Sequence, residues 1–296
     1  MKGDNKAFLR VDGAPLFIHV LRAMDDVLKI RRIFIVGEKT RLDSAIAESG
    51  VFKKPIVTIQ QYENLAANIW NTFIATLDGY TPGAEKTNPD FAGRMLFFVP
   101  GDSPLITAGE INEFLDKADA DNFDYVAGLT PESALAQYLP KEGKPGIHMT
   151  CFNVREGRFR INNMHLGRPF AFQNKKAILQ MYNSRYQKNL RNIIHFLRDL
   201  WAIPKIRSKI WIYLVMQVAM MLSLAGLDRL GRWVSSFATT QDVFGGVGDI
   251  LGLRAGCVIT DHGGSALDVD NDADYETMLT MFAEWKAAAM KEETES

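Results

Sequence analysis

The sequence contains little of what marks secreted, metal-binding or nucleic-acid-binding proteins. Its two cysteines, Cys151 and Cys257, are too few and too far apart for a disulfide framework or a CxxC metal site, and they fit a reducing cytoplasm. The 34 Lys and Arg residues are balanced by 35 Asp and Glu residues, so no overall positive field would attract nucleic acid. The first ten residues are charged and no apolar run follows them, which predicts a cytoplasmic protein without a signal peptide.

Several enzyme motifs are also missing. The five histidines are scattered without an HExxH pattern, and no serine lies in a GxSxG sequence, which argues against metalloproteases and hydrolases. The segment FGGVGDILG is rich in glycine, but Leu251 occupies the position of the third glycine of a dinucleotide-binding motif. This segment is therefore not assigned to nucleotide binding.

What the sequence does contain is an alternation of strand and helix patterns. Of its 296 residues 47% are hydrophobic, which is enough for one large α/β domain or two small ones. Helices are predicted over 15–28, 63–77, 105–118 and 272–291, and strands over 31–38, 55–60, 95–99, 123–131 and 254–260. Residues 148–163 predict a hairpin turning at Glu156-Gly157, and 81–93 predict a loop. The alternation indicates a mostly parallel sheet between two helical layers, a three-layer α/β/α arrangement.

The middle of the chain breaks this alternation. Residues 173–239 lack strand patterns, which predicts a helical insertion into an α/β domain formed by 1–172 and 240–296. The insertion contains an apolar helix over 210–227, with basic residues on both sides. Its length is borderline for crossing a bilayer, and packing in the core or a homodimer interface, docking on a membrane surface and spanning a membrane all remain open.

The most informative stretch is the apolar run 95–99, which ends in Pro100-Gly101-Asp102-Ser103-Pro104. Asp102 is thereby predicted at the carboxyl end of a buried strand, where open α/β sheets bind ligands and where a carboxylate could hold a metal ion. The alternative is that Asp102 caps the following helix. Thr107 lies closer to that helix and could cap it, with Glu110 completing a capping box.

A second acidic cluster precedes the last helix. Asp268 and Asp270 alternate along a presumed extended segment and are expected on the same face, so that together with Asp102 they could bind Mg²⁺. The competing interpretation is that these acidic residues only favour the dipole of the helix, which Asn271 can cap. Near the start of the chain, Lys6 could contact phosphate oxygens, although such a lysine is more often simply solvated.

Four segments and their order along the chain resemble the nucleotidyltransferases related to molybdenum-cofactor guanylyltransferase and to sugar- and alcohol-phosphate cytidylyltransferases. The segments are KAFLRVDGAPLFIHVL, RRIFIVG, FVPGDSPLIT and LDVDNDADYE. The resemblance covers roughly residues 4–165 and 240–290. It implies a glycosyltransferase-A-like nucleotidyltransferase fold and transfer of a nucleoside monophosphate from a nucleoside triphosphate to a phosphorylated small-molecule acceptor, with release of pyrophosphate.

The resemblance also implies roles for individual residues. Lys6 and Asp102 would be catalytic and bind the nucleotide, and Asp102 and Asp270 would hold the Mg²⁺ cofactor. Asp268 stays a third candidate metal ligand on the alternation of the acidic run alone. Asn162 and Asn163, after the predicted hairpin, are candidates for binding the second substrate. Such enzymes begin with a strand and a glycine-rich loop of the kind LAGGxGxRM, and this chain starts at about the Met of that motif. We therefore expect a start assigned too far downstream and a longer natural protein. The alternative is a chain that has lost its nucleotide-binding loop and first strand, which would leave the sheet incomplete and the enzyme inactive.

Two other functions stay open at this point. Asp268-Val269-Asp270 is formally a DxD motif, as in nucleotide-sugar glycosyltransferases, but it lies just before the last helix rather than after a mid-domain strand. A non-catalytic relative that uses its apolar helix to bind a membrane or a partner protein would fit the missing glycine-rich loop.

Overall fold

The structure is a computed structural model that describes residues 5–174 and 210–295. The part of the predicted helical insertion over 175–209 lies outside the described residues. Besides the elements introduced below, the chain forms short pieces at η1 (Lys6–Phe8), β1 (Arg10–Val11), β2 (Ala14–Pro15), η2 (Ala84–Lys86), α4 (Pro89–Ala92), α6 (Glu132–Leu135), η3 (Pro169–Ala171) and η4 (Gly264–Ala266).

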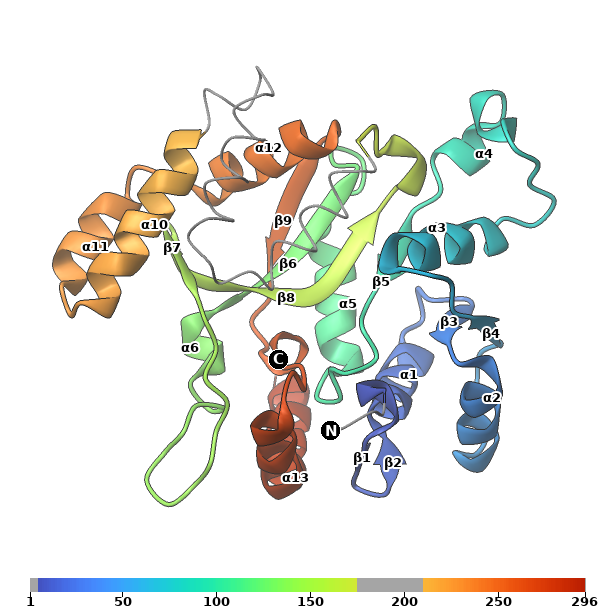
Figure 1. Ribbon diagram of the computed structural model, residues 1–296, viewed down its shortest axis with the longest axis horizontal. Coiled ribbons are helices and arrows are strands. Elements are labelled where there is room, and N and C mark those ends of the chain that lie inside the picture. Colours follow the sequence, from blue (N-terminus) through green and yellow to red (C-terminus); the bar gives the residue numbers. More distant parts are fainter. Residues whose placement is uncertain (1–4, 175–209, 296) are drawn as a thin grey trace.

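A five-stranded sheet forms the centre of the molecule (Figure 1). Its order is β5 (Leu96–Phe98), β8 (Gly157–Gly167), β6 (Tyr125–Pro131) and β9 (Ala255–Ile259), and β7 (Phe152–Val154) pairs with β8. β6 and β9 are parallel, whereas β8 is antiparallel to β5, β6 and β7. Four of these five strands therefore share one direction, and the exception is the long second strand of the hairpin that the sequence predicts.

Helices cover both faces of this sheet. On one face α1 (Leu16–Asp26) and α5 (Ala108–Lys117) pack their apolar side chains, among them Val20 and Phe114, against Val126 and Met164 of the sheet. On the other face Phe244 of α12 (Thr240–Leu251) packs among residues of β6, β7 and β8. The three-layer α/β/α arrangement is confirmed, and Val126, Ala127 and Leu129 of the central strand β6 are buried between the layers.

Two predicted strands lie outside the central sheet. β3 (Ile33–Gly37) and β4 (Ile56–Gln60) pair in parallel and form a two-stranded sheet, with α2 (Lys39–Glu48) connecting them and α3 (Leu65–Ala75) following. Within the described residues β3 pairs with β4 alone and β5 with β8 alone, so each has one edge without a strand beside it. In the described part of the chain the predicted strands are thus divided between the central sheet and the β3–β4 pair.

Some boundaries differ from the sequence prediction. α1 ends at Asp26 because Val27 takes an extended conformation, and Leu28, the last residue of the predicted helix, is 92% exposed. The predicted loop 81–93 contains η2 and α4. Asn88 caps α4 and Pro89 opens it, a start signal for a helix that the loop assignment overlooked.

The cap of α5 is partly as predicted. The Thr107 hydroxyl accepts a hydrogen bond from the Glu110 backbone N–H at 3.2 Å. The capping box is wrong, because the Glu110 carboxyl group turns away and accepts bonds from the backbone and hydroxyl of Ser265, at 2.8 and 2.6 Å. Ser265 lies in η4, far away in sequence, so local spacing could not reveal this partner.

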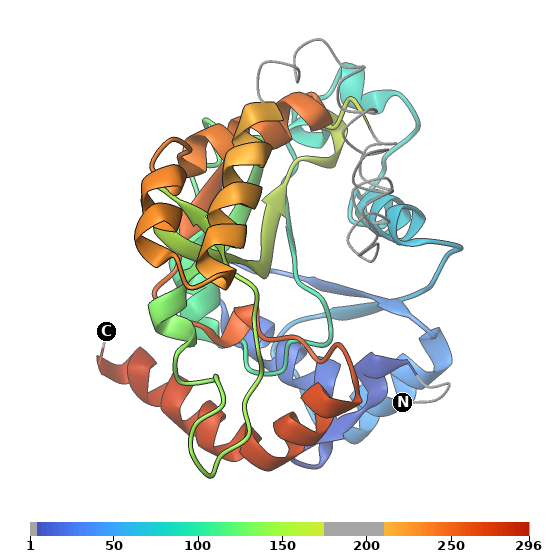
Figure 2. The same ribbon diagram turned by 60° about the vertical axis from the view of Figure 1, so that its left-hand side comes forward.

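Two helices of the predicted insertion lie against β7 at one end of the molecule. The apolar helix is α10 (Ile210–Leu224), shorter than the predicted 210–227, and it packs beside α11 (Asp228–Ser235), as Figure 2 shows. No helix in the described part of the chain combines the length and hydrophobicity needed to cross a membrane.

Candidate functional site

Two loops bring the predicted carboxylates together. Asp102 follows β5, and Asp268 and Asp270 lie between η4 and α13 (Asp272–Glu295). The backbone N–H of Val269 donates to the carbonyl oxygen of Asp102 at 3.1 Å, which ties the loops to each other. The Val269 side chain is fully buried in the core. Successive side chains of an extended segment alternate in direction, so Asp268 and Asp270 point away from that core.

Lys6 joins this group from the start of the chain. It lies in η1, whose first turn is capped by the Asn5 side chain, and its Nζ lies 3.2 Å from Oδ1 of Asp270. Asp270 in turn immediately precedes the cap of α13, where the Asn271 side chain accepts a bond from the Asp274 backbone. A cation and a carboxylate from opposite ends of the described chain therefore meet at one place.

Burial and neighbouring carboxylates raise the pKa of Asp102 and of Asp268. Burial is the largest cause that raises the pKa of Asp102 to about 6, the charges of Asp268 and Asp270 add to it, and Lys6 acts in the opposite direction. Burial and the charge of Asp270 also raise the pKa of Asp268, against the lowering effect of Arg160. Crowded carboxylates of this kind are stabilised by a bound cation, which would offset their repulsion.

Arg160 is a site residue that the sequence analysis missed. From β8 its Nη2 lies 3.0 Å from Oδ1 of Asp268, and its Nε donates to the carbonyl oxygen of Ala266 at 2.9 Å. The alternation along the predicted hairpin indicated which face Arg160 occupies, but not that a loop more than a hundred residues later would meet it. Arg160 thereby engages one of the three predicted metal ligands.

The two candidate asparagines face opposite sides of β8. The Asn163 amide donates to the hydroxyl of Ser103, the neighbour of Asp102, at 2.9 Å. Asn162 is buried, donates to the hydroxyls of Thr130 and Thr260 at 3.2 Å each, and accepts from the Met164 backbone. Asn163 is thus close to Asp102, whereas the structure gives Asn162 partners inside the sheet.

The carboxylates of this site fit a cation whose remaining ligands come from a bound substrate. In the described ranges no group of three or more His, Cys, Asp or Glu side chains could hold a metal ion. Mg²⁺ commonly uses one or two protein carboxylates and takes its other ligands from water and substrate phosphates. Asp102 and Asp270 offer two such carboxylates: the charge of Asp270 raises the pKa of Asp102, and Lys6 lies 3.2 Å from Asp270.

Comparisons with known proteins find similar sequences and structures. A curated relative, the 2-C-methyl-D-erythritol 4-phosphate cytidylyltransferase of Chlorobium luteolum, is 23% identical over 173 residues, and the match covers 58% of this chain and 65% of the relative. The solved structure of a hypothetical transferase from Thermus thermophilus superposes with a TM-score of 0.55 at 21% identity, covering 92% of this chain and 91% of that one.

A 4-diphosphocytidyl-2C-methyl-D-erythritol synthase from Anaerococcus prevotii gives a TM-score of 0.48 at 12% identity, over 96% and 92% of the two chains. The superposition on the Thermus structure supports the glycosyltransferase-A-like fold that the sequence predicted. The MobA-like NTP transferase domain matches residues 1–194, about two thirds of the sequence, and this chain belongs to that family.

Proposed function

We propose that this protein is a nucleotidyltransferase that moves a nucleoside monophosphate from a nucleoside triphosphate to a phosphorylated small-molecule acceptor. Family membership supports nucleotidyl transfer, and the name of the curated relative, a cytidylyltransferase for an alcohol phosphate, suggests the acceptor class. The observation that carries the proposal is the meeting of Lys6, Asp102 and Asp270 at the ends of three separate segments.

The reaction requires little covalent participation by the protein. An oxygen of the acceptor phosphate attacks the α-phosphorus, a new P–O bond forms, and the bond to the β-phosphate breaks, so that pyrophosphate leaves with the electron pair. The nucleophile is already anionic, and no proton has to be removed. The contribution of the site is then to position the two phosphates and to neutralise their charge, as in other phosphoryl transfers.

Each residue has a distinct task in this proposal. Lys6 contacts the triphosphate and offsets the negative charge that develops on the leaving pyrophosphate. Asp102 and Asp270 hold Mg²⁺, which supplies charge neutralisation and alignment of the phosphate oxygens when bound. Asn163, fixed by Ser103, offers an amide to the acceptor.

The test is a pyrophosphate-release assay with four nucleoside triphosphates, Mg²⁺ and a set of sugar and polyol phosphates. We expect activity with one preferred nucleotide, and a loss on the order of 100-fold in kcat/KM for Asp102→Asn and for Asp270→Asn. Asp272→Asn, an exposed residue in the same acidic run, is the matched control and should retain activity. Circular dichroism confirms that each variant is folded.

Two results would reject the proposal. Activity that survives both substitutions would show that Asp102 and Asp270 do not contribute to the reaction. Release of a nucleoside diphosphate from a nucleotide sugar, with no pyrophosphate from any triphosphate, would instead identify a glycosyltransferase.

We also propose that α10 and α11 contact a membrane surface. An exposed stripe of Trp211, Leu214, Val218 and Met221 recurs at helical spacing along α10, and Leu230 and Trp233 are exposed on the adjacent α11. Arg229 and Arg232 are exposed on α11 as well. Aromatic and basic side chains around an apolar helix face are typical of interfacial binding to anionic lipids.

Liposome flotation tests this second proposal. The protein should float with vesicles that contain anionic phosphatidylglycerol, less with neutral vesicles, and less when Trp211 and Met221 are both replaced by Ser. Failure to float, or a dimer in analytical ultracentrifugation that the same replacements dissociate, would assign the stripe to a protein interface instead.

A further inference from the structure

The loop that carries Asp268 and Asp270 is held by contacts from three other segments. It consists of residues 264–271, from η4 to the cap of α13, and we call it the acidic loop. A side chain of α5 holds its backbone near the beginning, and the backbone that follows β5 holds it near the end. Neither of these two contacts involves a carboxylate of the loop, so they do not set the direction of Asp268 or Asp270.

Arg160 makes the third contact, from β8, which lies against η4. Its Nε donates to the carbonyl oxygen of Ala266 at 2.9 Å, and its Nη2 lies 3.0 Å from Oδ1 of Asp268. A guanidinium group is planar and keeps its N–H donors in a fixed fork. The two bonds together therefore fix the direction of the Asp268 side chain relative to the backbone of the acidic loop.

The position of Arg160 is itself fixed by the central sheet. Arg160 lies opposite Thr130 of β6 in the strand register. Its neighbour Phe159 is buried and lies opposite Phe152 of β7. Asn162, two residues further along β8, is buried and donates to the Thr130 hydroxyl at 3.2 Å. Arg160 thus projects from a strand that is paired on both sides, which is a rigid support for a neighbouring loop.

The pair formed by Arg160 and Asp268 is better shielded from water than the other ion pair of this loop. The side chains of Arg160 and Asp268 are 24% and 16% exposed, whereas those of Lys6 and Asp270 are 36% and 53% exposed. Ion pairs that are open to water contribute little to stability, and separating a shielded pair leaves a poorly solvated charge. Asp268 is therefore held in place, while Asp270 is able to change its partner.

Asp268 nevertheless lies close to Asp102. Burial raises the pKa of Asp102 to about 6, and the charge of Asp268 is the next largest cause, ahead of the charge of Asp270. Even so, no group of three or more His, Cys, Asp or Glu side chains within 5–174 and 210–295 could hold a metal ion. A carboxylate that lies near Asp102 but is turned toward Arg160 accounts for both observations.

We propose that Arg160 is a positioning residue of the nucleotidyltransferase site, which keeps Asp268 out of the metal ligands and leaves the cation to Asp102 and Asp270. This inference rests on the proposed function. The positive charge of Arg160 offsets that of Asp268, which is then not added to the charge of the other two carboxylates. One or two protein carboxylates are the usual number for Mg²⁺, because water and substrate phosphates supply the remaining ligands. A third carboxylate on the ion would take a place that a phosphate oxygen needs.

The test is a titration with Mn²⁺ alone, in which electron paramagnetic resonance measures the free ion. Arg160→Met frees Asp268 to turn toward the ion, and this variant should bind Mn²⁺ about tenfold more tightly than the unmodified protein. In the pyrophosphate-release assay the same variant should have a kcat about tenfold lower, because the third carboxylate competes with the phosphates. A merely structural role of Arg160 would weaken both metal binding and turnover, so the opposite directions identify positioning.

Asp268→Asn shows whether Asp268 is the carboxylate responsible. Asparagine keeps an oxygen that can accept from Arg160, so the single variant should bind Mn²⁺ as the unmodified protein does. Combined with Arg160→Met, the same substitution should abolish the gain in Mn²⁺ affinity. Circular dichroism confirms that each variant is folded.

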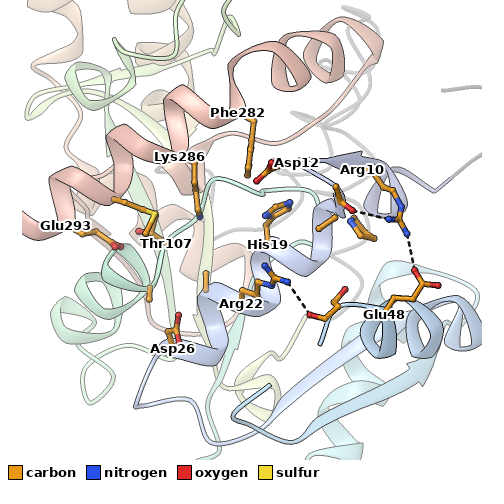
Figure 3. Close-up of a pocket in the computed structure, with 17 residues that line it drawn as sticks. Arg10, Asp12, His19, Arg22, Asp26, Glu48, Thr107, Phe282, Lys286 and Glu293 are labelled. Atoms are coloured by element: carbon orange, nitrogen blue, oxygen red, sulfur yellow. Dashed lines mark hydrogen bonds and ion pairs between the residues drawn. The ribbon is translucent and has the colours of Figure 1, made fainter. Parts of the chain in front are cut away.

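Arg22→Met is the matched control. Arg22 also donates to a main-chain carbonyl oxygen, that of Ser49 at 3.2 Å. Figure 3 shows Arg22 on α1, in a cavity beside α13 whose lining includes neither Arg160 nor the carboxylates of the site. Loss of this arginine should leave both the Mn²⁺ affinity and the kcat unchanged.

Three results would overturn the proposal. The first is an Arg160→Met variant that binds Mn²⁺ no more tightly than the unmodified protein. The second is a gain in affinity that persists when Asp268→Asn is added. The third is weaker Mn²⁺ binding by Asp268→Asn alone, which would make Asp268 a ligand and decides the question even if Arg160→Met does not fold. Absence of pyrophosphate release from every triphosphate would reject the proposed function instead, and the titration with the metal alone would still decide whether Arg160 keeps Asp268 from the ion.

Discussion

The buried carboxyl group of Glu110 makes the stability of this protein depend on pH. Glu110 is completely buried at the start of α5. Among the described contacts, its carboxyl group accepts hydrogen bonds from the backbone N–H and the hydroxyl of Ser265 alone. Burial raises its pKa from 4.5 to about 7, helped by the charges of Glu113 and Glu293 and opposed by the Ser265 hydrogen bonds. The folded state therefore favours the protonated form.

The higher pKa of Glu110 in the folded chain sets the sign and the size of the pH dependence of stability. Below pH 4.5 the carboxyl group is protonated in both states, and its contribution to stability is fully present. As the pH rises through 7, the unfolded chain has already lost the proton that the folded chain retains, so the contribution is lost. A pKa of about 7 instead of 4.5 corresponds to about 3 kcal/mol of unfolding free energy by pH 8.

The substitution Glu110→Gln should remove this pH dependence. Glutamine can accept from the Ser265 backbone and donate to its hydroxyl, so both bonds can be kept in a neutral side chain. Between pH 4.5 and 8 the stability of the variant should rise relative to the unmodified protein by about 3 kcal/mol, measured by urea unfolding at several pH values.

The control for Glu110→Gln is a substitution on the exposed side of α5. Asp116→Asn removes one negative charge from the exposed side of the same helix, where Asp116 pairs with Lys29, and it should not reproduce the effect. A free-energy difference between the Glu110→Gln variant and the unmodified protein that stays constant across this pH range would refute the reasoning. It would mean that Glu110 ionises alike in the folded and unfolded chains.

Three further substitutions test other parts of the structure. Gly128→Ala should lower stability by about 2–3 kcal/mol in chemical denaturation, because the added Cβ would lie 2.0 Å from Oδ1 of the buried Asn162. Lys6→Met should reduce kcat/KM for the nucleotide on the order of 100-fold in pyrophosphate release without a comparable loss of stability. Glu293→Gln should lower the unfolding free energy by about 0.5–1 kcal/mol at low salt, since it removes an anion from the Gly109 N–H at the start of α5.

Most of the strands could be predicted because they are short apolar runs with clear ends. The helix α2 could not, since only Leu42 and Ala45 of its ten residues are buried and the apolar periodicity is correspondingly weak. The separation of β3 and β4 from the five-stranded sheet was also not predictable from strand patterns. It depends on which edges find a partner, and that is a property of the whole fold rather than of β3 or β5.

In the candidate site, too, local features could be predicted from the sequence and contacts between distant segments could not. Asp102 at a strand end and the alternation of Asp268 and Asp270 are local features, and the structure brings all three within reach of one another's charge. The opposite placement of Asn162 and Asn163 could have been anticipated, because neighbouring residues of a strand face opposite sides of the sheet. The contact of Arg160 with Asp268 depends on tertiary packing and has no signal in the sequence.

The partners of the two loop carboxylates suggest how the proposed site would assemble. Asp268 is held by Arg160 with a side chain only 16% exposed, whereas Asp270 is 53% exposed and pairs with Lys6. Triphosphate oxygens would compete with Asp270 for Lys6, and this competition would release Asp270 to a cation at the moment when phosphate ligands arrive. We therefore expect tight metal binding only together with the nucleotide, which Mn²⁺ titration with and without the preferred triphosphate would measure. Equal Mn²⁺ affinity in both titrations would argue that the carboxylates bind the ion unaided.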